Sequence, residues 1–573
     1  MDKTTLSRPV RRRTFFLGAS ASLAIAAGST MLIGQSSARQ RVTSRQALQQ
    51  ALDSARSGDT FELALPDTSH VLRFIDADFS AALGFAADVD RRFGYTVLAS
   101  QLALVTPRSD PSGRRGAAIM VAPQAGIAAE IFGARADSSL SRMGTDNTPV
   151  IGVALALLRG LYERGGRTAY DQLGGGTVRF DDTRGIYGQM SAWLLQSHTR
   201  LAGQGHLRNL REKSQSACDT CVLMPGNIGP DKRFGLEASP DVFRIRPVSP
   251  GDTTVRLAQR SDGGFRTGDI IVLTSADTYR SGRNIRWSDM NVNEVTAIDG
   301  DTLRLMHPVP ESYGDGSMLR CVRGNWSDPL GNPVEFAKYA GIDGLTLSNV
   351  STDGRGIMGL GASWKCSYRY RLGPETYSGH TANFNAWTRI DMAGEIKYKV
   401  CDIAYGSQDF EFRSDCVNNE DLNFVAHAFG ERARRGKVDI RYRAPRQSKK
   451  AALTTNSAVD VDFVVDIDQP LATPVNVTSS REHQTSGGSL SGVIRTSPAA
   501  KYGVLVWDAG AEVGDPFVID NLQIVGRPSV ASIFASKRGI GLSVDVRSIS
   551  VDTPPKIDQG QGRIRMGSVR MIG

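Results

Sequence analysis

The sequence predicts an all-β protein built as an elongated solenoid, and three features of the chain support this. Glycine accounts for 60 of the 573 residues, about 10% against a usual ~7%, which favours a protein rich in turns and strands. After residue 335, short apolar strands recur at a spacing that drifts within roughly 20–40 residues, as in coils with loops of uneven length. The 22% of charged and 40% of hydrophobic residues exclude a chain that is disordered throughout.

Residues 1–38 have the pattern of an export signal rather than of a folded element. Residues 11–17 read RRRTFFL, an apolar run rich in Ala and Gly follows, and residues 36–38 (SSA) offer small side chains to a signal peptidase. The paired arginines resemble a twin-arginine signal, which implies export to the periplasm or the cell exterior. The alternative is an uncleaved membrane anchor, but the run is short for a span of about 20 residues.

Cleavage after residue 38 lowers the formal net charge from +9 to +5. A modest positive charge on an exported protein suits an anionic glycan or a cell surface. Nucleic acid is not an expected partner, because no dense Lys/Arg stripe interleaved with aromatic residues occurs. No later segment holds 18 consecutive apolar residues, so the cleaved chain is not expected to insert into a membrane.

Residues 39–127 are predicted to cap the first coil. A helix is expected over residues 45–55, with Ser44 as its N-cap. A turn at residues 57–59 (SGD) then leads into a strand at residues 60–63. Many solenoids close their first open coil with such a helix, turn and strand.

Residues 128–205 carry the most informative motifs. They read IFGARAD at 131–137, TDNTPVI at 145–151 and GGGTVRF at 174–180. Thr148 or Asn147 caps a helix that has Pro149 in its first turn. The apolar stripe of this helix consists of Ile151, Ala154, Leu155, Leu158 and Leu161. The glycines then allow a sharp entry into a strand.

This order of motifs resembles the opening of the pectate-lyase-like right-handed parallel β-helix superfamily, which is also seen in phage tailspike depolymerases. There an FGA…D…TDNT segment leads into a capping helix and then GGGTV.F, and SHTRLAGQG at 197–205 is similar to the next strand and turn. The chain departs from the pattern at 136–139, where a GDG loop is usual, and lacks a Pro-Gly turn after Phe180. The resemblance implies a right-handed parallel β-helix with N-terminal capping helices. It identifies no catalytic group.

Residues 250–320 are predicted to form a small inserted β-module. Short strands are expected at 254–257, 265–273, 293–298 and 302–305, and Asp299-Gly300 is a strong hairpin turn. Antiparallel hairpins do not fit parallel coils, so the β-helix is predicted to cover 128–249 and to resume over 321–573. The strands expected in the resumed part are 342–350, 387–392, 410–417, 438–442, 459–467, 504–507, 517–525 and 540–551.

Six cysteines occur, at positions 218, 221, 321, 366, 401 and 416. An oxidising compartment permits disulfides among them. Cys218 and Cys221 have the spacing of a redox pair or half a zinc site, but no second CxxC or nearby pair of histidines completes it. A local disulfide or buried thiols, and no metal, are expected there.

The densest cluster of polar groups in the resumed solenoid is 380–443, which holds two of the seven histidines. In β-helices of this kind the substrate lies along an exposed sheet face, so this region is the predicted site. A lyase that acts on uronate glycans needs cations or a metal to neutralise the carboxylate and a base to take the adjacent proton. The catalytic candidates are His427, Tyr405 and Lys437, and the substrate-binding candidates are Arg389, Arg432, His380 and Asn385.

Each of these residues also has a structural alternative. His427 stands in the apolar sequence VAHAF at 425–429, where a histidine can be a packed, hydrogen-bonded core residue. Residues 431–437 can be a solvated loop. If His427 is catalytic, its substitution should abolish turnover. If it is structural, its substitution should lower stability.

A second constellation is DVDFVVDID at 460–468. Alternation directs the apolar residues inward and places Asp460, Asp462, Asp466 and Asp468 on the outer face. Paired carboxylates could serve as acid and base of a hydrolase, or could bind Ca²⁺. They could equally be the solvated face of an edge strand.

The function predicted at class level is that of an exported carbohydrate-active enzyme that cleaves an acidic polysaccharide by β-elimination. The first alternative is a glycoside hydrolase that uses paired aspartates. The second is a non-catalytic glycan-binding or surface-structural solenoid.

Overall fold

The structure is a computed structural model. It describes residues 39–65, 69–82, 116–120, 126–164, 166–213, 221–225, 227–228, 242–259, 264–280, 286–314, 316–322, 326–327, 333–351, 356–359, 362–404, 406–421, 423–430, 432–478, 485–507, 515–536, 543–557 and 563–572. The predicted twin-arginine signal at residues 1–38 lies outside these ranges, so it stays a prediction.

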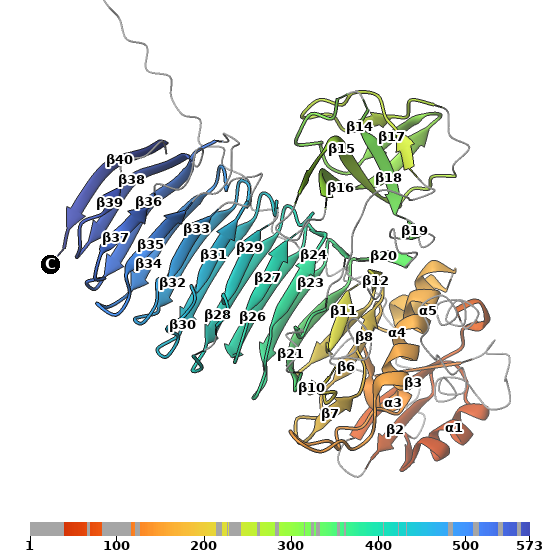
Figure 1. The fold of residues 1–573 in the computed structure, drawn as a ribbon. Coiled ribbons are helices and arrows are strands. Elements are labelled where there is room, and N and C mark those ends of the chain that lie inside the picture. The colour runs from red at the N-terminus through yellow and green to blue at the C-terminus, as the bar shows by residue number, and fades with distance from the viewer. Residues whose placement is uncertain are drawn as a thin grey trace, which may run out of the picture.

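The chain coils into a three-sided parallel β-helix, and Figure 1 shows the coils stacked along one axis. The longest side, here called the first sheet, has 15 strands that pair in parallel. They are β5 (Ile127–Ala128), β6 (Thr177–Phe180), β7 (Ile186–Gln189), β9 (Arg200–Gly203), β10 (His206–Asn209), β21 (Gly341–Asn349), β23 (Ser367–Leu372), β26 (Arg389–Glu395), β28 (Glu411–Val417), β30 (Lys437–Arg443), β32 (Asp462–Asp468), β34 (Ser489–Arg495), β36 (Phe517–Val525), β38 (Ser543–Val551) and β40 (Arg563–Met571).

The second sheet is parallel and has eight strands. They are β24 (His380–Asn383), β27 (Cys401–Ala404), β29 (His427–Gly430), β31 (Leu453–Asn456), β33 (Val475–Thr478), β35 (Tyr502–Trp507), β37 (Ala531–Ala535) and β39 (Lys556–Ile557). In the first coils, β8 (Trp193–Leu195) and β11 (Leu223–Pro225) form a separate parallel pair.

The third face is narrower than the two sheets. It begins with the parallel strands β20 (Pro333–Lys338), β22 (Ala362–Trp364) and β25 (Asn385–Ala386), and β12 (Asn227–Ile228) and β19 (Trp326–Ser327) pair antiparallel with β20. Single parallel bridges then link one residue of each later coil: Ala386, Gln408, Arg434, Val459 and Ser486. Each of these coils passes from the second sheet to the third face and on to the first sheet.

Strict alternation of side chains explains why these segments form strands around a common core. In β30, Val438, Ile440 and Tyr442 are buried, whereas Lys437 and Arg441 face solvent. A period of two places all apolar side chains of a strand on one face, which the neighbouring coils cover. All eight strands predicted for the resumed solenoid overlap strands of the structure. The predicted all-β, right-handed parallel β-helix class is confirmed.

Helices close the N-terminal end of the solenoid (Figure 1). They are α3 (Ala129–Phe132), α4 (Thr148–Glu163) and α5 (Arg167–Gln172). The five predicted stripe residues of α4 are all buried. Asn147 is the N-cap residue of α4, one of the two predicted, but its side chain makes no capping hydrogen bond. Its Oδ1 accepts from Arg135 N at 2.7 Å, and its Nδ2 donates to Gly188 O at 2.9 Å. Asn147 therefore fastens the cap to the first coil.

A four-stranded sheet precedes these helices. It consists of β1 (Gln40–Val42), β2 (Thr60–Ala64), β3 (Ser69–Ile75) and β4 (Ala117–Met120), and α1 (Arg45–Asp53) packs beside it. Ser44 caps α1 as predicted, because its hydroxyl accepts a hydrogen bond from Ala47 N at 3.1 Å. Behind β3, Glu130 is buried, accepts a hydrogen bond from the Tyr187 hydroxyl and lies 3.6 Å from His70 Nε2.

Glu130 is expected to make the stability of this end depend on pH. Burial raises the pKa of Glu130 from 4.5 to about 7, although the Tyr187 hydrogen bond opposes the shift. The folded protein therefore holds this proton more tightly than the unfolded chain, and the stabilisation is complete below pH 4.5 and lost as the pH rises to 7. Between pH 5 and pH 8, ionisation of Glu130 should lower the free energy of unfolding of the wild type by at most about 3 kcal/mol, and Glu130→Gln should abolish this decrease. Denaturant unfolding of both proteins at the two pH values measures this, and parallel pH profiles would contradict it.

The inserted module is a six-stranded antiparallel sheet on the third face. Its strands are β13 (Val242–Arg244), β14 (Thr254–Arg256), β15 (Ile270–Arg280), β16 (Arg286–Asp299), β17 (Thr302–Leu305) and β18 (Met318–Val322), and the predicted Asp299-Gly300 hairpin joins β16 to β17. The predicted boundaries of 250–320 fall within this range.

A buried apolar cluster fixes the module to the solenoid. Ile270, Val272, Met290 and Val292 of the module pack against six side chains of the coils: Phe336, Ala362, Trp364, Phe384, Ala386 and Ala404. At its centre the indole of Trp364 donates a hydrogen bond to Glu294 at 2.7 Å, which gives the buried carboxylate a partner. The module is thus held by packing and by a satisfied polar contact.

The cysteines of the described coils are buried thiols. Cys366, Cys401 and Cys416 lie in the core, and Cys221 is buried in the first coils. Cys218 and the Cys321 side chain lie outside what the structure describes, whereas for Cys221 the structure has the buried thiol, the second of the two expected alternatives. Within the described ranges, no helix has both the length and the apolar character that crossing a membrane requires.

Candidate functional site

Three of the predicted site residues lie inside the solenoid. His427, His380 and Asn385 are each at most 1% exposed. The His427 ring donates to Ala452 O at 2.9 Å and accepts from the Ser414 hydroxyl at 3.0 Å. Burial lowers the pKa of His427 to about 4 and that of His380 to about 3. Their position favours the structural alternative, because a polysaccharide outside the coils cannot contact them.

His427→Ala is accordingly expected to lower stability and to leave turnover intact. It removes two buried hydrogen bonds and leaves a cavity, at a cost of about 1–3 kcal/mol. Denaturant unfolding measures the loss, and Ser414→Ala, which removes only one of the two bonds, should cost less. If His427→Ala abolished turnover at unchanged stability, the catalytic interpretation would be restored.

Two further candidates, Tyr405 and Arg432, are not found on the sheet face. Tyr405 lies outside the described residues. Arg432 stands at the turn after β29, where it has a positive φ of 65° and leads into the third face. Its side chain is therefore not placed on the outer face of the first sheet.

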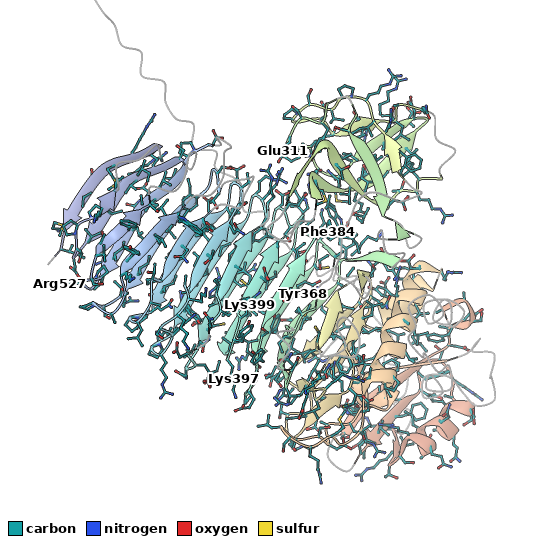
Figure 2. The ribbon with its side chains drawn as sticks, in the orientation of Figure 1. Glu311, Tyr368, Phe384, Lys397, Lys399 and Arg527 are labelled. Carbon is teal, nitrogen blue, oxygen red and sulfur yellow. The ribbon has the colours of Figure 1, made fainter. Side chains whose placement is uncertain are left out.

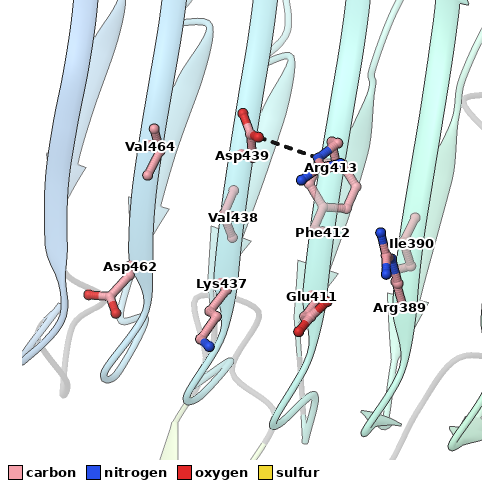
Figure 3. Close-up of a pocket in the computed structure, with 10 residues that line it drawn as sticks. All are labelled: Arg389, Ile390, Glu411, Phe412, Arg413, Lys437, Val438, Asp439, Asp462 and Val464. Carbon is pink, nitrogen blue, oxygen red and sulfur yellow. Dashed lines mark ion pairs between the residues drawn. The ribbon is translucent and has the colours of Figure 1, made fainter. Parts of the chain in front are cut away.

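The remaining two candidates, Arg389 and Lys437, lie in line on the first sheet. Arg389 pairs with Glu411 across β26 and β28, Glu411 with Lys437 across β28 and β30, and Lys437 with Asp462 across β30 and β32. Figure 3 shows these four side chains at the same end of neighbouring strands. We call them the groove row. They line a shallow pocket of about 330 Å³, together with Arg413, Asp439 and Val464 one step further along the strands.

As far as the structure describes the chain, the cations of the groove row are not paired with carboxylates, in contrast to those of the next row along the strands. In the next row along the strands, Arg413 pairs with Asp439 at 3.3 Å (Figure 3), and Arg369 pairs with Asp343. Among the described residues, Arg389 and Lys437 form no ion pair within 4 Å. Both side chains are exposed, so their positive charges are available to a ligand.

A second row runs beside the groove row, two residues earlier in each coil. Its members, here called the corner row, stand where the third face turns into the first sheet: Tyr339, Lys365, Trp387, Asp409, Arg435 and Asp460. All six have left-handed φ angles between 49° and 55°. L-residues other than Gly, Asn and Asp rarely adopt this conformation, and its recurrence in six successive coils forms the corner between the third face and the first sheet. Tyr339 and Trp387 are each 39% exposed.

The inserted module reaches the corner row through Glu294 of β16 and through the segment after β17. His307 stacks on Trp387 with ring centroids 3.8 Å apart, and the Tyr339 hydroxyl donates to Glu294 at 2.7 Å. Glu311 forms an ion pair with Arg434 and lies 3.5 Å from Arg435. Figure 2 labels Glu311 on the side of the module next to the coils. The module therefore adds a carboxylate and an imidazole to the row.

Charged groups concentrate at the C-terminal part of the corner row. Asp409 and Arg435 form a two-pronged ion pair with distances of 2.8 and 2.9 Å. Partial desolvation raises the pKa of Asp460, and the carboxylates of Asp515 and Glu311 act in the same direction while Arg435 opposes it. Asp460 is thus a carboxyl group that holds its proton more readily than usual, close to the carboxylates of Asp515 and Glu311.

The four predicted aspartates separate into two groups. Asp462, Asp466 and Asp468 face outward from β32 as predicted, and Asp466 pairs with Arg495. Asp460 precedes the strand and belongs to the corner row, whereas Asp462 lies in the groove row and accepts a hydrogen bond from the Ser489 hydroxyl at 2.7 Å. Within the described ranges, no three His, Cys, Asp or Glu side chains are placed to hold a metal ion such as Ca²⁺.

Sequence analysis did not select Trp387, Glu411 or Glu311 as candidate residues, and it included Asp409 only as one polar group of the stretch 380–443. The sequence does contain a pattern that marks Trp387, Asp409 and Glu411. Before each apolar strand of these coils, two outward residues flank one inward residue, as in Trp387-Thr388-Arg389 and Asp409-Phe410-Glu411. For Glu311 no such signal exists, because its place depends on how the module docks.

No protein-family model matches the sequence, and no curated protein matches it significantly. Among solved structures, the chain is similar to the tailspikes of Pseudomonas phage phi297 (11% identity) and Pseudomonas phage LKA1 (13% identity), each with a TM-score of 0.40 and coverage of 78% of this chain and 81% of that chain. It is also similar to the A-module of a mannuronan C-5 epimerase of Azotobacter vinelandii, with 13% identity, a TM-score of 0.36, and 78% and 99% of the two chains covered.

Proposed function

We propose that the protein binds an acidic polysaccharide along the groove row and the corner row and cleaves its glycosidic bonds. The observation that carries the proposal is the pair of exposed, unpaired cations Arg389 and Lys437 beside the exposed ring of Trp387. Cations select anionic sugars, and an exposed indole offers an apolar face to a sugar ring. Both rows run along the solenoid axis, as an extended chain requires.

Hydrolysis is the chemistry that this site supports best. A water molecule attacks the anomeric carbon while the bond to the leaving oxygen breaks. Asp460, whose pKa is raised, donates its proton to that oxygen, and Asp462 takes the proton of the attacking water. The two carboxyl groups lie in the same coil, on the two rows that hold the substrate.

β-Elimination is the second candidate, and the unpaired cations favour it. Arg389 would neutralise a uronate carboxylate, and the amine of Lys437, after releasing its own proton to solvent, would take the proton from the adjacent carbon. The glycosidic oxygen then leaves as the carbon–carbon double bond forms. His427 and His380, which lie in the core, contribute no base to this route.

A panel of uronate-containing and neutral glycans, scored for chain shortening, tests the proposal. Shortening of acidic polymers only is expected. Absorbance of an unsaturated uronide in the product assigns β-elimination, and a new reducing end without that absorbance assigns hydrolysis. Binding without shortening would leave a glycan-binding solenoid, and absence of both would contradict the proposal.

We also propose that the chain is exported folded through the twin-arginine route to the periplasm or the cell exterior. Replacing both Arg12 and Arg13 by Lys should trap the protein in the cytoplasm, because this route requires the paired guanidinium groups. Fractionation of cells that express each form measures the distribution. Normal export of the double variant would contradict the proposal.

A further inference from the structure

The signs of the charges alternate along the groove row. Arg389, Glu411, Lys437 and Asp462 stand on four successive strands in register, as +, −, + and −. Neighbouring strands lie about 4.8 Å apart, so the two cations are separated by about 9.6 Å with one carboxylate between them. The row therefore presents positive charge only at every second coil.

Glu411 is exposed at the pocket and is not neutralised by its neighbours in the groove row. In the described part of the chain it takes part in no ion pair within 4 Å, whereas the next row consists of paired charges such as Arg413 and Asp439. A carboxylate between two cations that it does not neutralise repels an anionic group placed opposite to it.

A bound polysaccharide meets these charges in sequence, because each sugar of an extended chain advances by about the rise of one coil. A polymer with an acid on every sugar would set two carboxylates against Arg389 and Lys437 and the carboxylate between them against Glu411. A polymer in which acidic sugars alternate with uncharged or amine-bearing sugars places its acids at the cations alone. Repulsion of the wrong partner is a common source of specificity.

We propose that the groove row selects acidic polysaccharides in which charged and non-acidic sugars alternate, and that Glu411 is the residue that excludes polymers of uronate alone. The inference rests on the proposed function, since it takes the groove row as the place where the polysaccharide binds. It adds a statement about which sugars of the polysaccharide carry an acid. The two unpaired cations by themselves do not specify this.

Binding of four polymers to the full chain tests the inference. Hyaluronan and heparosan carry a uronate on alternate sugars, and polygalacturonate and alginate carry one on every sugar. At equal uronate concentration, the wild-type protein should bind an alternating polymer at least tenfold more tightly than either homopolymer. Glu411→Gln should reduce the difference in affinity between alternating polymers and homopolymers. Glu411→Lys should improve homopolymer binding by more than tenfold.

Glu395→Lys is the matched control. Glu395 is an exposed carboxylate on β26 outside the groove row, so the variant has the same net charge as Glu411→Lys. Equal binding of both polymer classes by the wild type, or equal effects of the two lysine variants, would overturn the inference and leave the proposed function standing. If none of the four polymers bound, the proposed function would fall as well.

Discussion

Asp460→Asn should reduce the rate of chain shortening by about 10²–10⁴-fold, the range that a positioned general acid contributes. The amide has nearly the same shape as the protonated carboxyl group but cannot give up a proton to the leaving oxygen. Binding should be almost unchanged, since the cations Arg389 and Lys437 remain in place. Reducing-end assays at saturating substrate, together with a binding titration, separate the two effects.

Two further variants show whether the loss belongs to Asp460 itself. Gly487→Ala should also slow shortening, because a methyl group there would collide with the Asp460 carboxylate. Asp466→Asn, on the same outer face and paired with Arg495, should leave the rate unchanged. If Asp460→Asn kept full activity while Lys437→Ala lost it, the chemistry would be β-elimination.

Trp364→Ala should destabilise the protein by about 3–5 kcal/mol, the usual cost of removing a buried aromatic side chain. The indole is fully buried between the module and the coils and donates to Glu294. Its removal opens a cavity in the cluster that holds the module and leaves a buried carboxylate short of one partner. Chemical denaturation measures the loss, and limited proteolysis should cut within residues 242–322 before the solenoid.

Trp387→Ala is the control for this substitution. It removes the same side chain from a neighbouring coil, but at a position that is 39% exposed, so stability should fall much less. Glycan binding should weaken instead, because the ring next to Arg389 is lost. Equal stability losses for the two tryptophans would contradict the docking role of Trp364.

The outcome for the site residues follows from the coil geometry. The densest polar stretch, 380–443, was the predicted active face, and it contains residues from all three sides of the solenoid. Arg389 and Lys437 come from the first sheet, whereas His427 and His380 point inward from the second. Polarity alone does not distinguish them, because a buried histidine with two hydrogen-bond partners satisfies its polar atoms as well as an exposed one.

The proposed function puts hydrolysis before β-elimination, the reverse of the sequence prediction, for a structural reason. β-Elimination was expected to use His427 or Tyr405 as its base, but burial removes His427 from the substrate. Asp460 and Asp462 were expected to share one strand face. The left-handed turn at Asp460 instead places it on the corner row next to Glu311 and Asp515, where nearby carboxylates help to raise its pKa.

Local sequence patterns are sufficient to predict most strands of the first sheet, the capping helix α4 and the antiparallel module. Alternation with period two, a helical apolar stripe and a hairpin turn are properties of neighbouring residues, so they can be recognised without knowing the fold. The tertiary structure alone decided which residues of different coils share a row. Glu411 becomes the neighbour of Arg389 and Lys437 because parallel coils are in register, and Glu311 reaches Arg434 because the module packs on Trp364. Such contacts depend on the length of each coil and on how the module packs on the coils. No single segment of the sequence encodes these properties.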